Sequence, residues 1–162
     1  MLLSEILHSK VVTTDLQAET KYEAIEELVD LLVEAHEIPL SLREHIVEGI
    51  FERERSMSTG MEKGIALPHG SSDRIEDIIG ALGISQHDIP FESIDGKPAR
   101  LVILLVLPRQ NFQGHVRTLA GIAHVLSNDV LREALIAAPT PEEVIELIEE
   151  EEDKEVFDPY RA

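Results

Sequence analysis

Cysteine is absent from this chain of 162 residues, basic residues are scarce, and long apolar runs are missing. Without cysteine, disulfides, thiolate catalysis and cysteine-based metal sites are excluded. No apolar run approaches the roughly 18 residues that a membrane-spanning helix requires. The first ten residues, MLLSEILHSK, are too short and too amphipathic for a signal peptide. We therefore expect a cytoplasmic protein that does not insert into a membrane.

The charge of the chain is strongly one-sided. Its 14 basic residues stand against 32 acidic ones, and the formal net charge is −18. Such an excess of negative charge repels polyanions at long range, so nucleic acid and anionic membranes are disfavoured as partners. The acidic run from Glu142 to Glu155 is typical of a solvated helix end and tail. With 43% hydrophobic residues, the chain is long enough for one domain with a sizeable core.

Hydrophobic periodicity and capping residues predict alternating helices and strands. Two segments, 78–84 and 101–107, are continuously apolar, which indicates strands buried on both faces of a helix-covered sheet. Pairs of the form Thr20 with Glu23 and Ser41 with Glu44 predict helix starts, and Thr140-Pro141 predicts another. The other expected elements are a short helix at 2–7, a strand at 11–13, and helices at 114–127 and 129–138. This order predicts a single α/β domain, a three-layer sandwich whose central mixed sheet is flanked by helices on both faces.

The stretch from Arg53 to Gly70, RERSMSTGMEKGIALPHG, carries the most chemistry. Its glycines fit backbone that bends or approaches a neighbour closely, and Pro68 fixes its own φ and pushes Leu67 toward an extended conformation. The imidazole of His69 is therefore expected on stiff backbone. Such a histidine can act as a nucleophile through one nitrogen while a hydrogen bond fixes the tautomer through the other.

A second histidine stands in a favourable place. His115 is expected to open a helix after the loop that leaves the most hydrophobic strand, and open α/β sheets bind ligands near such strand ends. The N-terminus of a helix also favours an anion. The remaining histidines lack a neighbouring motif and are interpreted as ordinary: His8, His36, His45, His87 and His124.

The stretch resembles the active-site region of the mannitol/fructose-type enzyme IIA domains of the bacterial sugar phosphotransferase system, including their nitrogen-related regulatory branch. The matching residues are Arg53-Glu54, Ser58-Thr59-Gly60, Gly64 and Ala66-Leu67-Pro68-His69, and His115-Val116-Arg117-Thr118-Leu119-Ala120 fits the context of the family's second active-site histidine. The resemblance runs over roughly residues 3 to 150. It implies an enzyme IIA domain at residues 1–152, and residues 153–162 are then an acidic C-terminal tail.

The resemblance implies phosphoryl transfer through a phosphohistidine, without cofactor or metal. His69 would accept the phosphoryl group from a histidine phosphocarrier protein and pass it to a IIB component. His115 would donate a hydrogen bond to the phosphoryl group, and Arg53 would offset its charge, for which a guanidinium fork is well suited. Ser58, Thr59, Gly60, Gly64 and Pro68 are expected to support the site, although the two hydroxyls fit local turns equally well.

Other functions remain open at this point. The same phosphohistidine serves either sugar uptake or a regulatory signal, whose partner contacts would depend on phosphorylation, and the motif fits both. Glu62 stands where the regulatory branch often has glycine, which bears on partner choice. A zinc hydrolase using His69, His115 and a carboxylate is a remote alternative, since no His-Glu-x-x-His spacing is present. A serine hydrolase is disfavoured because Gly70-Ser71-Ser72 does not form the Gly-x-Ser-x-Gly elbow.

Overall fold

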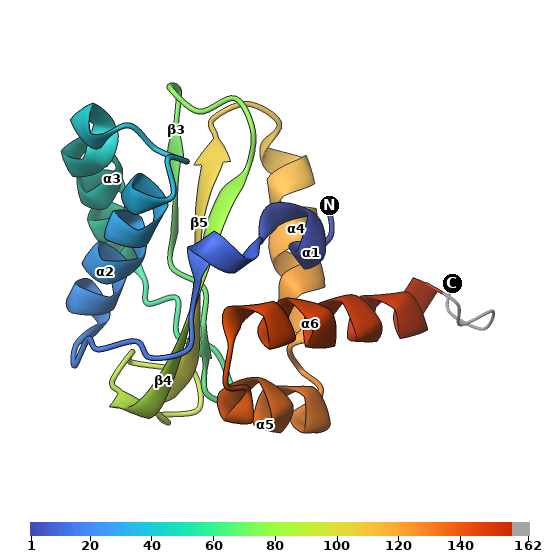
Figure 1. Cartoon of the computed structure of the whole chain (residues 1–162). Helices are drawn as coiled ribbons and strands as arrows, with labels where there is room; N and C mark the ends of the chain where they lie inside the picture. The colour runs from blue at the N-terminus through green and yellow to red at the C-terminus, as the bar shows by residue number, and fades with distance from the viewer. Residues whose placement is uncertain (157–162) are drawn as a thin grey trace.

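The computed structural model describes residues 1–156 as a sheet between two layers of helices (Figure 1). The helices are α1 (Leu3–Ile6), α2 (Lys21–Glu34), α3 (Arg43–Ser56), α4 (Phe112–Val125), α5 (Asp129–Ala137) and α6 (Pro141–Val156), with 3₁₀ turns at Ser9–Val11 and Leu40–Leu42. The strands are β1 (Val12–Thr13), β2 (Ile65–Ala66), β3 (His69–Ser72), β4 (Ile79–Ile89) and β5 (Ala99–Pro108). In Figure 1, α2 and α3 lie on one side of the sheet and α4, α5 and α6 on the other. The predicted three-layer sandwich is confirmed.

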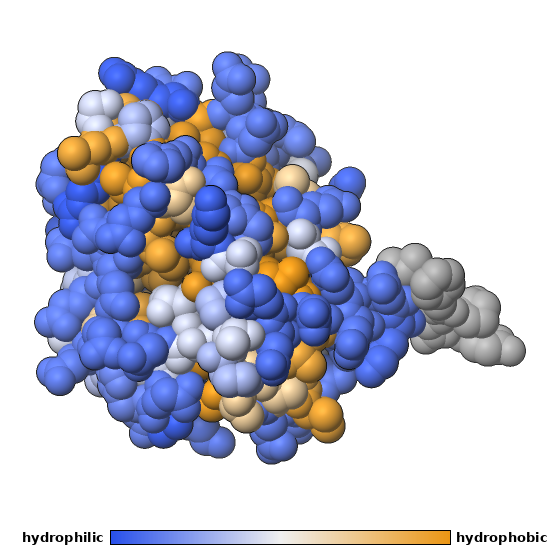
Figure 2. All heavy atoms as spheres, in the orientation of Figure 1, coloured by the Kyte–Doolittle hydropathy of each residue, from blue (hydrophilic) through white to orange (hydrophobic). Residues whose placement is uncertain are grey.

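The sheet is mixed and is built around β5. β4 pairs with β5 antiparallel, β1 pairs with β4 parallel, and the short strands β2 and β3 both pair with β5 in parallel. Every residue from 101 to 107 is at most 6% exposed, which confirms that β5 is buried on both faces. Hydrophilic residues cover most of the face shown in Figure 2, with hydrophobic residues visible between them.

Several helix boundaries follow the capping residues. The Thr20 hydroxyl accepts a hydrogen bond from the Glu23 N–H, and the Thr140 hydroxyl accepts one from the Glu143 N–H, as the sequence predicts. The predicted start at Ser41 is wrong. A 3₁₀ turn occupies residues 40–42, and α3 begins at Arg43 after Leu42, which offers no side-chain cap.

Two further differences concern the strands and α4. The apolar run at 78–84 continues as strand to Ile89, and β2 and β3 have no counterpart among the predicted elements because they are short and pair with a distant strand. Helix α4 spans 112–125, so the predicted 114–127 is displaced by two residues at each end. The proposed boundary between Glu152 and Asp153 falls within α6, and residues 157–162 of the expected tail lie outside the described part. The division into domain and tail stays a prediction.

Candidate phosphoryl-transfer site

Backbone pairing fixes His69 at the start of β3. His69 lies opposite Leu105 of β5, and the carbonyl of Pro68 accepts a hydrogen bond of 3.0 Å from the Leu105 N–H. The next residue, Gly70, lies against α3, where an added Cβ would approach the Ile50 side chain to 2.9 Å. This contact explains the glycine, because a larger residue would force α3 away from the strand that carries His69.

The ring of His69 is oriented by its own chain. Its Nδ1 lies 2.8 Å from the carbonyl oxygen of Leu67. A carbonyl only accepts hydrogen bonds, so Nδ1 carries the proton and Nε2 keeps its lone pair. Burial lowers the pKa of His69 below its usual 6.5, and the positive charge of Arg53 lowers it further, although the hydrogen bond to Leu67 acts in the opposite direction. The ring is therefore held neutral, with Nε2 available for bond formation.

Arg53 approaches the site from the last turn of α3. One of its guanidinium nitrogens donates a hydrogen bond of 2.9 Å to the carbonyl of Met57, just beyond the end of the helix. Arg53 and His69 line two cavities together, one of about 390 Å³ and one of about 330 Å³. This bond uses one of the five guanidinium N–H donors, so the others remain for an anion in either cavity.

His115 lines the larger of these two cavities from α4. It is 8% exposed, and its Nε2 donates to the carbonyl of Gln110 at 2.6 Å. The neutral ring therefore presents only an acceptor at Nδ1. It can donate to a phosphoryl group after protonation at Nδ1 or after release from Gln110. The structure thus brings the three predicted residues His69, Arg53 and His115 to one cavity, and it assigns the Nε2 proton of His115 to the loop before α4.

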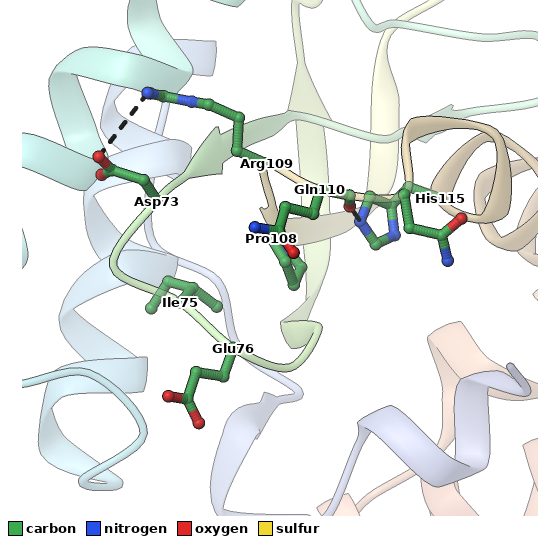
Figure 3. A pocket seen from close by; sticks show the side chains of 8 residues that line it. Asp73, Ile75, Glu76, Pro108, Arg109, Gln110 and His115 are labelled. Atoms are coloured by element: carbon green, nitrogen blue, oxygen red, sulfur yellow. Dashed lines mark hydrogen bonds and ion pairs between the residues drawn. The ribbon is translucent and has the colours of Figure 1, made fainter.

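His115 also lines a cavity of about 640 Å³ (Figure 3). Polar residues from the β3–β4 loop and the β5–α4 loop line it, and Arg109 reaches across it to Asp73 with an ion-pair distance of 3.9 Å. Figure 3 shows the His115 ring against the backbone of Gln110. His69 does not line this cavity, but it lines the two smaller ones.

The hydroxyl groups of Ser58 and Thr59 are bound to protein acceptors. Ser58 Oγ donates to the carbonyl of Phe91, and Thr59 Oγ1 donates to a Glu54 carboxylate oxygen at 2.6 Å. Both residues line the smaller cavity beside His69. Their hydroxyl protons hold the loop in this structure, so any contact with a phosphoryl group would need a rearrangement of these bonds.

The two predicted glycines have different structural reasons. At Gly60 an added Cβ would lie 2.6 Å from Ser93 Oγ and 2.7 Å from the Phe91 carbonyl oxygen. Gly64 has φ of +77°, which L side chains rarely adopt, and its carbonyl accepts the N–H groups of Arg100 and Leu101. Together they let the 57–64 segment lie close to β5 and its neighbouring loop.

Sequence reasoning named Glu54 in the motif but gave it no role, and it missed Lys21. Glu54 is 2% exposed and accepts hydrogen bonds from the Thr59 N–H and hydroxyl. Its carboxylate lies 3.5 Å from the ammonium of Lys21, which is 7% exposed and also pairs with Glu92 at 3.1 Å. Burial lowers the pKa of Lys21, but Glu92 and Glu54 raise it by more, so the lysine stays charged. The unexpected burial of Lys21 has no sequence signal, since the first turn of a helix is usually solvated.

Comparison with known proteins identifies the fold and the family. The family described as "Phosphoenolpyruvate-dependent sugar phosphotransferase system, EIIA 2" matches residues 5–151. The chain belongs to this EIIA family. The nitrogen regulatory protein of Klebsiella oxytoca is 32% identical over 152 residues, which cover 91% of this chain and 90% of that protein. The family is one of phosphotransfer proteins, which confirms the resemblance, and its members include both sugar-specific and nitrogen-regulatory proteins.

Other relatives of this EIIA protein differ in their length. A fructose-specific EIIA component of Haloferax volcanii is 28% identical over 91% of this chain and 95% of its own length. A fructose-specific EIIABC component of Bacillus subtilis is 29% identical over 91% of this chain, but the chain spans only 23% of that protein. Activities of the longer protein therefore do not transfer directly to this EIIA chain.

Solved structures confirm the EIIA fold. A nitrogen regulatory protein IIA-Ntr from Neisseria meningitidis superposes with a TM-score of 0.81 at 28% identity, over 90% of this chain and 98% of that one. The enzyme IIA of an Escherichia coli mannitol complex superposes with a TM-score of 0.75 at 22% identity, over 89% and 97%. That complex contains phosphorylated enzyme IIB, so a domain of this fold binds a IIB component there.

Two observations concern the described part of the EIIA chain. No helix within residues 1–156 is both long and apolar enough to cross a membrane. In the same residues, no group of three or more histidine, aspartate or glutamate side chains is arranged to hold a metal ion.

Proposed function

We propose that this protein is a phosphocarrier whose His69 accepts a phosphoryl group on Nε2 from a histidine phosphocarrier protein and passes it to a IIB component. The observation that carries the proposal is the hydrogen bond from His69 Nδ1 to the Leu67 carbonyl, which leaves Nε2 as the nucleophilic atom in a cavity shared with Arg53 and His115. A relay of this kind operates in the cytoplasm, which is where we place the protein.

The transfer step needs positioning more than covalent chemistry. The Nε2 lone pair forms a bond to phosphorus while the phosphorus–nitrogen bond of the donor histidine breaks and returns its electron pair to the donor ring. The proton stays on Nδ1 of His69, hydrogen-bonded to the Leu67 carbonyl, throughout the transfer. The low pKa of His69 keeps the acceptor ring neutral, because a protonated Nε2 has no lone pair to offer.

Arg53 and His115 offer hydrogen-bond donors to the phosphoryl oxygens. Arg53 lines the cavity beside His69, and the guanidinium donors that its bond to Met57 does not use can bind the phosphoryl oxygens there. His115 can donate a hydrogen bond to the phosphoryl group from Nε2 once its bond to the Gln110 carbonyl is released.

The experiment is to mix the protein with a phosphorylated histidine phosphocarrier protein and then with candidate IIB proteins. We expect acid-labile, base-stable label on His69, and nuclear magnetic resonance of the phosphoprotein should place phosphorus on Nε2. His69→Ala should take up no label. His8→Ala is the matched control, because His8 is an exposed histidine paired with Glu37 and should leave labelling unchanged. Full labelling of His69→Ala would contradict the proposal.

The second stage separates transport from regulation. Relatives named nitrogen regulatory proteins, one of them 32% identical, favour a regulatory candidate in which the phosphoryl group controls contacts with target proteins. Rapid transfer from phosphorylated His69 to a sugar-specific IIB protein would support the transport role. A phosphoryl group that stays on His69 in the presence of all such proteins would support the regulatory role instead.

A further inference from the structure

A basic pocket lies away from His69, near the start of β5. A cavity of about 350 Å³ is lined by four cationic side chains, Lys63, Lys97, Arg100 and Arg132, and by one acidic residue, Asp88. These four are a large share of the 14 basic residues in a chain of net charge −18. They come from the turn before β2, the β4–β5 connection, β5 and α5. Only the fold brings them together.

The arginines of this pocket are held in place by acidic neighbours. Arg100 Nε donates to Asp88 at 2.8 Å, and Arg132 donates to the Leu126 carbonyl at 2.9 Å and to Asp129. The bond from Arg100 to Asp88 uses one edge of the guanidinium group, so other N–H donors remain. Arg132 is nearly covered, with a side chain 12% exposed. These contacts orient the two guanidinium groups without using all their donors.

Neither lysine ammonium of this pocket forms an ion pair within residues 1–156. The Lys63 ammonium has a contact of 3.4 Å to the Ser127 carbonyl, which is long for a hydrogen bond. Within residues 1–156, the Lys97 ammonium makes no hydrogen bond or ion pair. Asp95 accepts hydrogen bonds from the backbone N–H groups of both lysines, and these bonds, together with the charge of Lys97, lower the pKa of Asp95. Asp88, Asp95 and Asp129 together offset three of the four positive charges, so the pocket stays net positive on an acidic protein.

We propose that the basic pocket binds a small organic phosphate. A phosphate group matches both guanidinium forks and lysine ammonium groups, and it supplies the negative charge that the cluster lacks. A cavity of about 350 Å³ is at the lower end of the range for small-molecule sites, so the ligand is a small metabolite and not a nucleotide. The competing interpretation is a surface network of ion pairs that takes up no ligand.

The 57–64 segment connects this pocket with the His69 cavity. Lys63 precedes Gly64, whose carbonyl accepts the N–H groups of Arg100 and Leu101 at 2.9 and 3.1 Å. A ligand that binds both Lys63 and Arg100 would therefore fix the 57–64 segment more firmly against β5, and Ser58 at the other end of the segment lines the His69 cavity. This coupling rests on the proposed function of His69, whereas the binding itself does not.

The binding test is a titration of the ¹⁵N-labelled, unphosphorylated protein followed by amide chemical shifts. Glycerol 3-phosphate and inorganic phosphate are the probes, and potassium chloride at matched ionic strength is the blank. We expect saturating shifts at the amides of Lys63, Gly64, Lys97 and Arg100, with the organic phosphate binding more tightly. Lys97→Gln and Arg100→Gln should each weaken binding about tenfold, as for loss of one charge-assisted contact. Lys10→Gln, an exposed lysine remote from this pocket in sequence, should bind as the wild type does.

Several results would overturn the proposal. Shifts that do not saturate, that chloride reproduces, or that persist unchanged in Lys97→Gln would mean general screening by ions only. Equal affinity for glycerol 3-phosphate and inorganic phosphate would mean that the organic part of the ligand contributes nothing to binding, which contradicts the proposal of an organic phosphate. In a separate arm, glycerol 3-phosphate should change the rate of His69 phosphorylation at least twofold in the wild type and not in Lys97→Gln. An unchanged wild-type rate with normal binding would refute the coupling, and absence of any His69 phosphorylation would count against the proposed function, with the titration unaffected.

Discussion

Replacing the buried Glu54 with glutamine tests whether the Lys21–Glu54–Thr59 network holds the segment beside His69. The substitution keeps the shape of the side chain but removes its charge. The carboxylate accepts two hydrogen bonds from the Thr59 N–H, at 3.1 and 3.2 Å, and one from its hydroxyl at 2.6 Å, and it lies 3.5 Å from the Lys21 ammonium. Glutamine retains a single acceptor oxygen, and its NH₂ group would face these donors.

The expected loss of stability is about 3 kcal/mol. Breaking a buried ion pair by removing one partner costs about 3–5 kcal/mol, and the lower end applies here because Lys21 keeps Glu92 at 3.1 Å. Urea unfolding followed by circular dichroism measures this loss as a lower midpoint with an unchanged slope. Glu52→Gln, an exposed position on the same helix, is the control and should stay within about 0.5 kcal/mol of the wild type.

A double variant makes the test sharper. Lys21→Met with Glu54→Leu removes both charges and should cost less than the sum of the two single changes, since neither partner is left buried and unpaired. Glu54→Gln within about 0.5 kcal/mol of the wild type would refute the reasoning. The network would then contribute nothing measurable to the free energy of unfolding.

Four further outcomes follow from the site and the sheet. Arg53→Ala should still accept phosphate at His69 but more slowly, with about 2–4 kcal/mol less transition-state stabilisation, and Arg53→Lys should rescue it only in part; unchanged stopped-flow rates would contradict this. His115→Ala should also be labelled at His69, while its rate of handing phosphate on falls further than its rate of receiving it; a lower melting temperature with both rates unaltered would leave only a structural role. Because the pKa of His69 is lowered, its ring stays neutral as the pH falls below 6.5, so the rate of acceptance should hold there and fall only at more acidic pH; in Arg53→Gln, that fall should move to higher pH. Ile103→Ala, in the centre of β5, should cost about 2–5 kcal/mol in urea unfolding, and a wild-type midpoint would contradict its burial.

The strongest sequence signals were local ones. The apolar run at 101–107 predicts a strand buried on both faces because nothing polar interrupts it, and β5 is such a strand. By contrast, β3 consists of His-Gly-Ser-Ser, which carries no strand pattern and becomes a strand only because its backbone pairs with β5. Ser41 resembled a helix cap, yet a 3₁₀ turn at 40–42 moves the start of α3 beyond it.

The candidate site was predictable to the extent that its residues share one motif. Pro68 and His69 stand in one short run, and the structure adds which ring nitrogen is engaged, a fact that depends on the position of the Leu67 carbonyl. The bond from His115 to Gln110 could not be foreseen, because it depends on how the loop before α4 turns back. The same holds for the basic pocket, since its cationic residues are distributed from 63 to 132 and only Lys97 and Arg100 are close in the sequence.

Helix α6 does more than cover the sheet, because its Glu152 accepts the hydrogen bonds of the first turn of α1. The carboxylate is 3% exposed and accepts the N–H groups of Leu3 and Ser4 at 2.8 and 3.1 Å, across 149 and 148 residues of sequence. During synthesis at about 5–20 residues per second, the first helical turn therefore waits roughly 7 to 30 s for its acceptor to be made. Until then its leading amides depend on water and its apolar side chains on transient contacts. A ribosome that stalls before Glu152 is added would thus present Leu3 and Ser4 without their acceptor, and this segment would be open to chaperones and proteases.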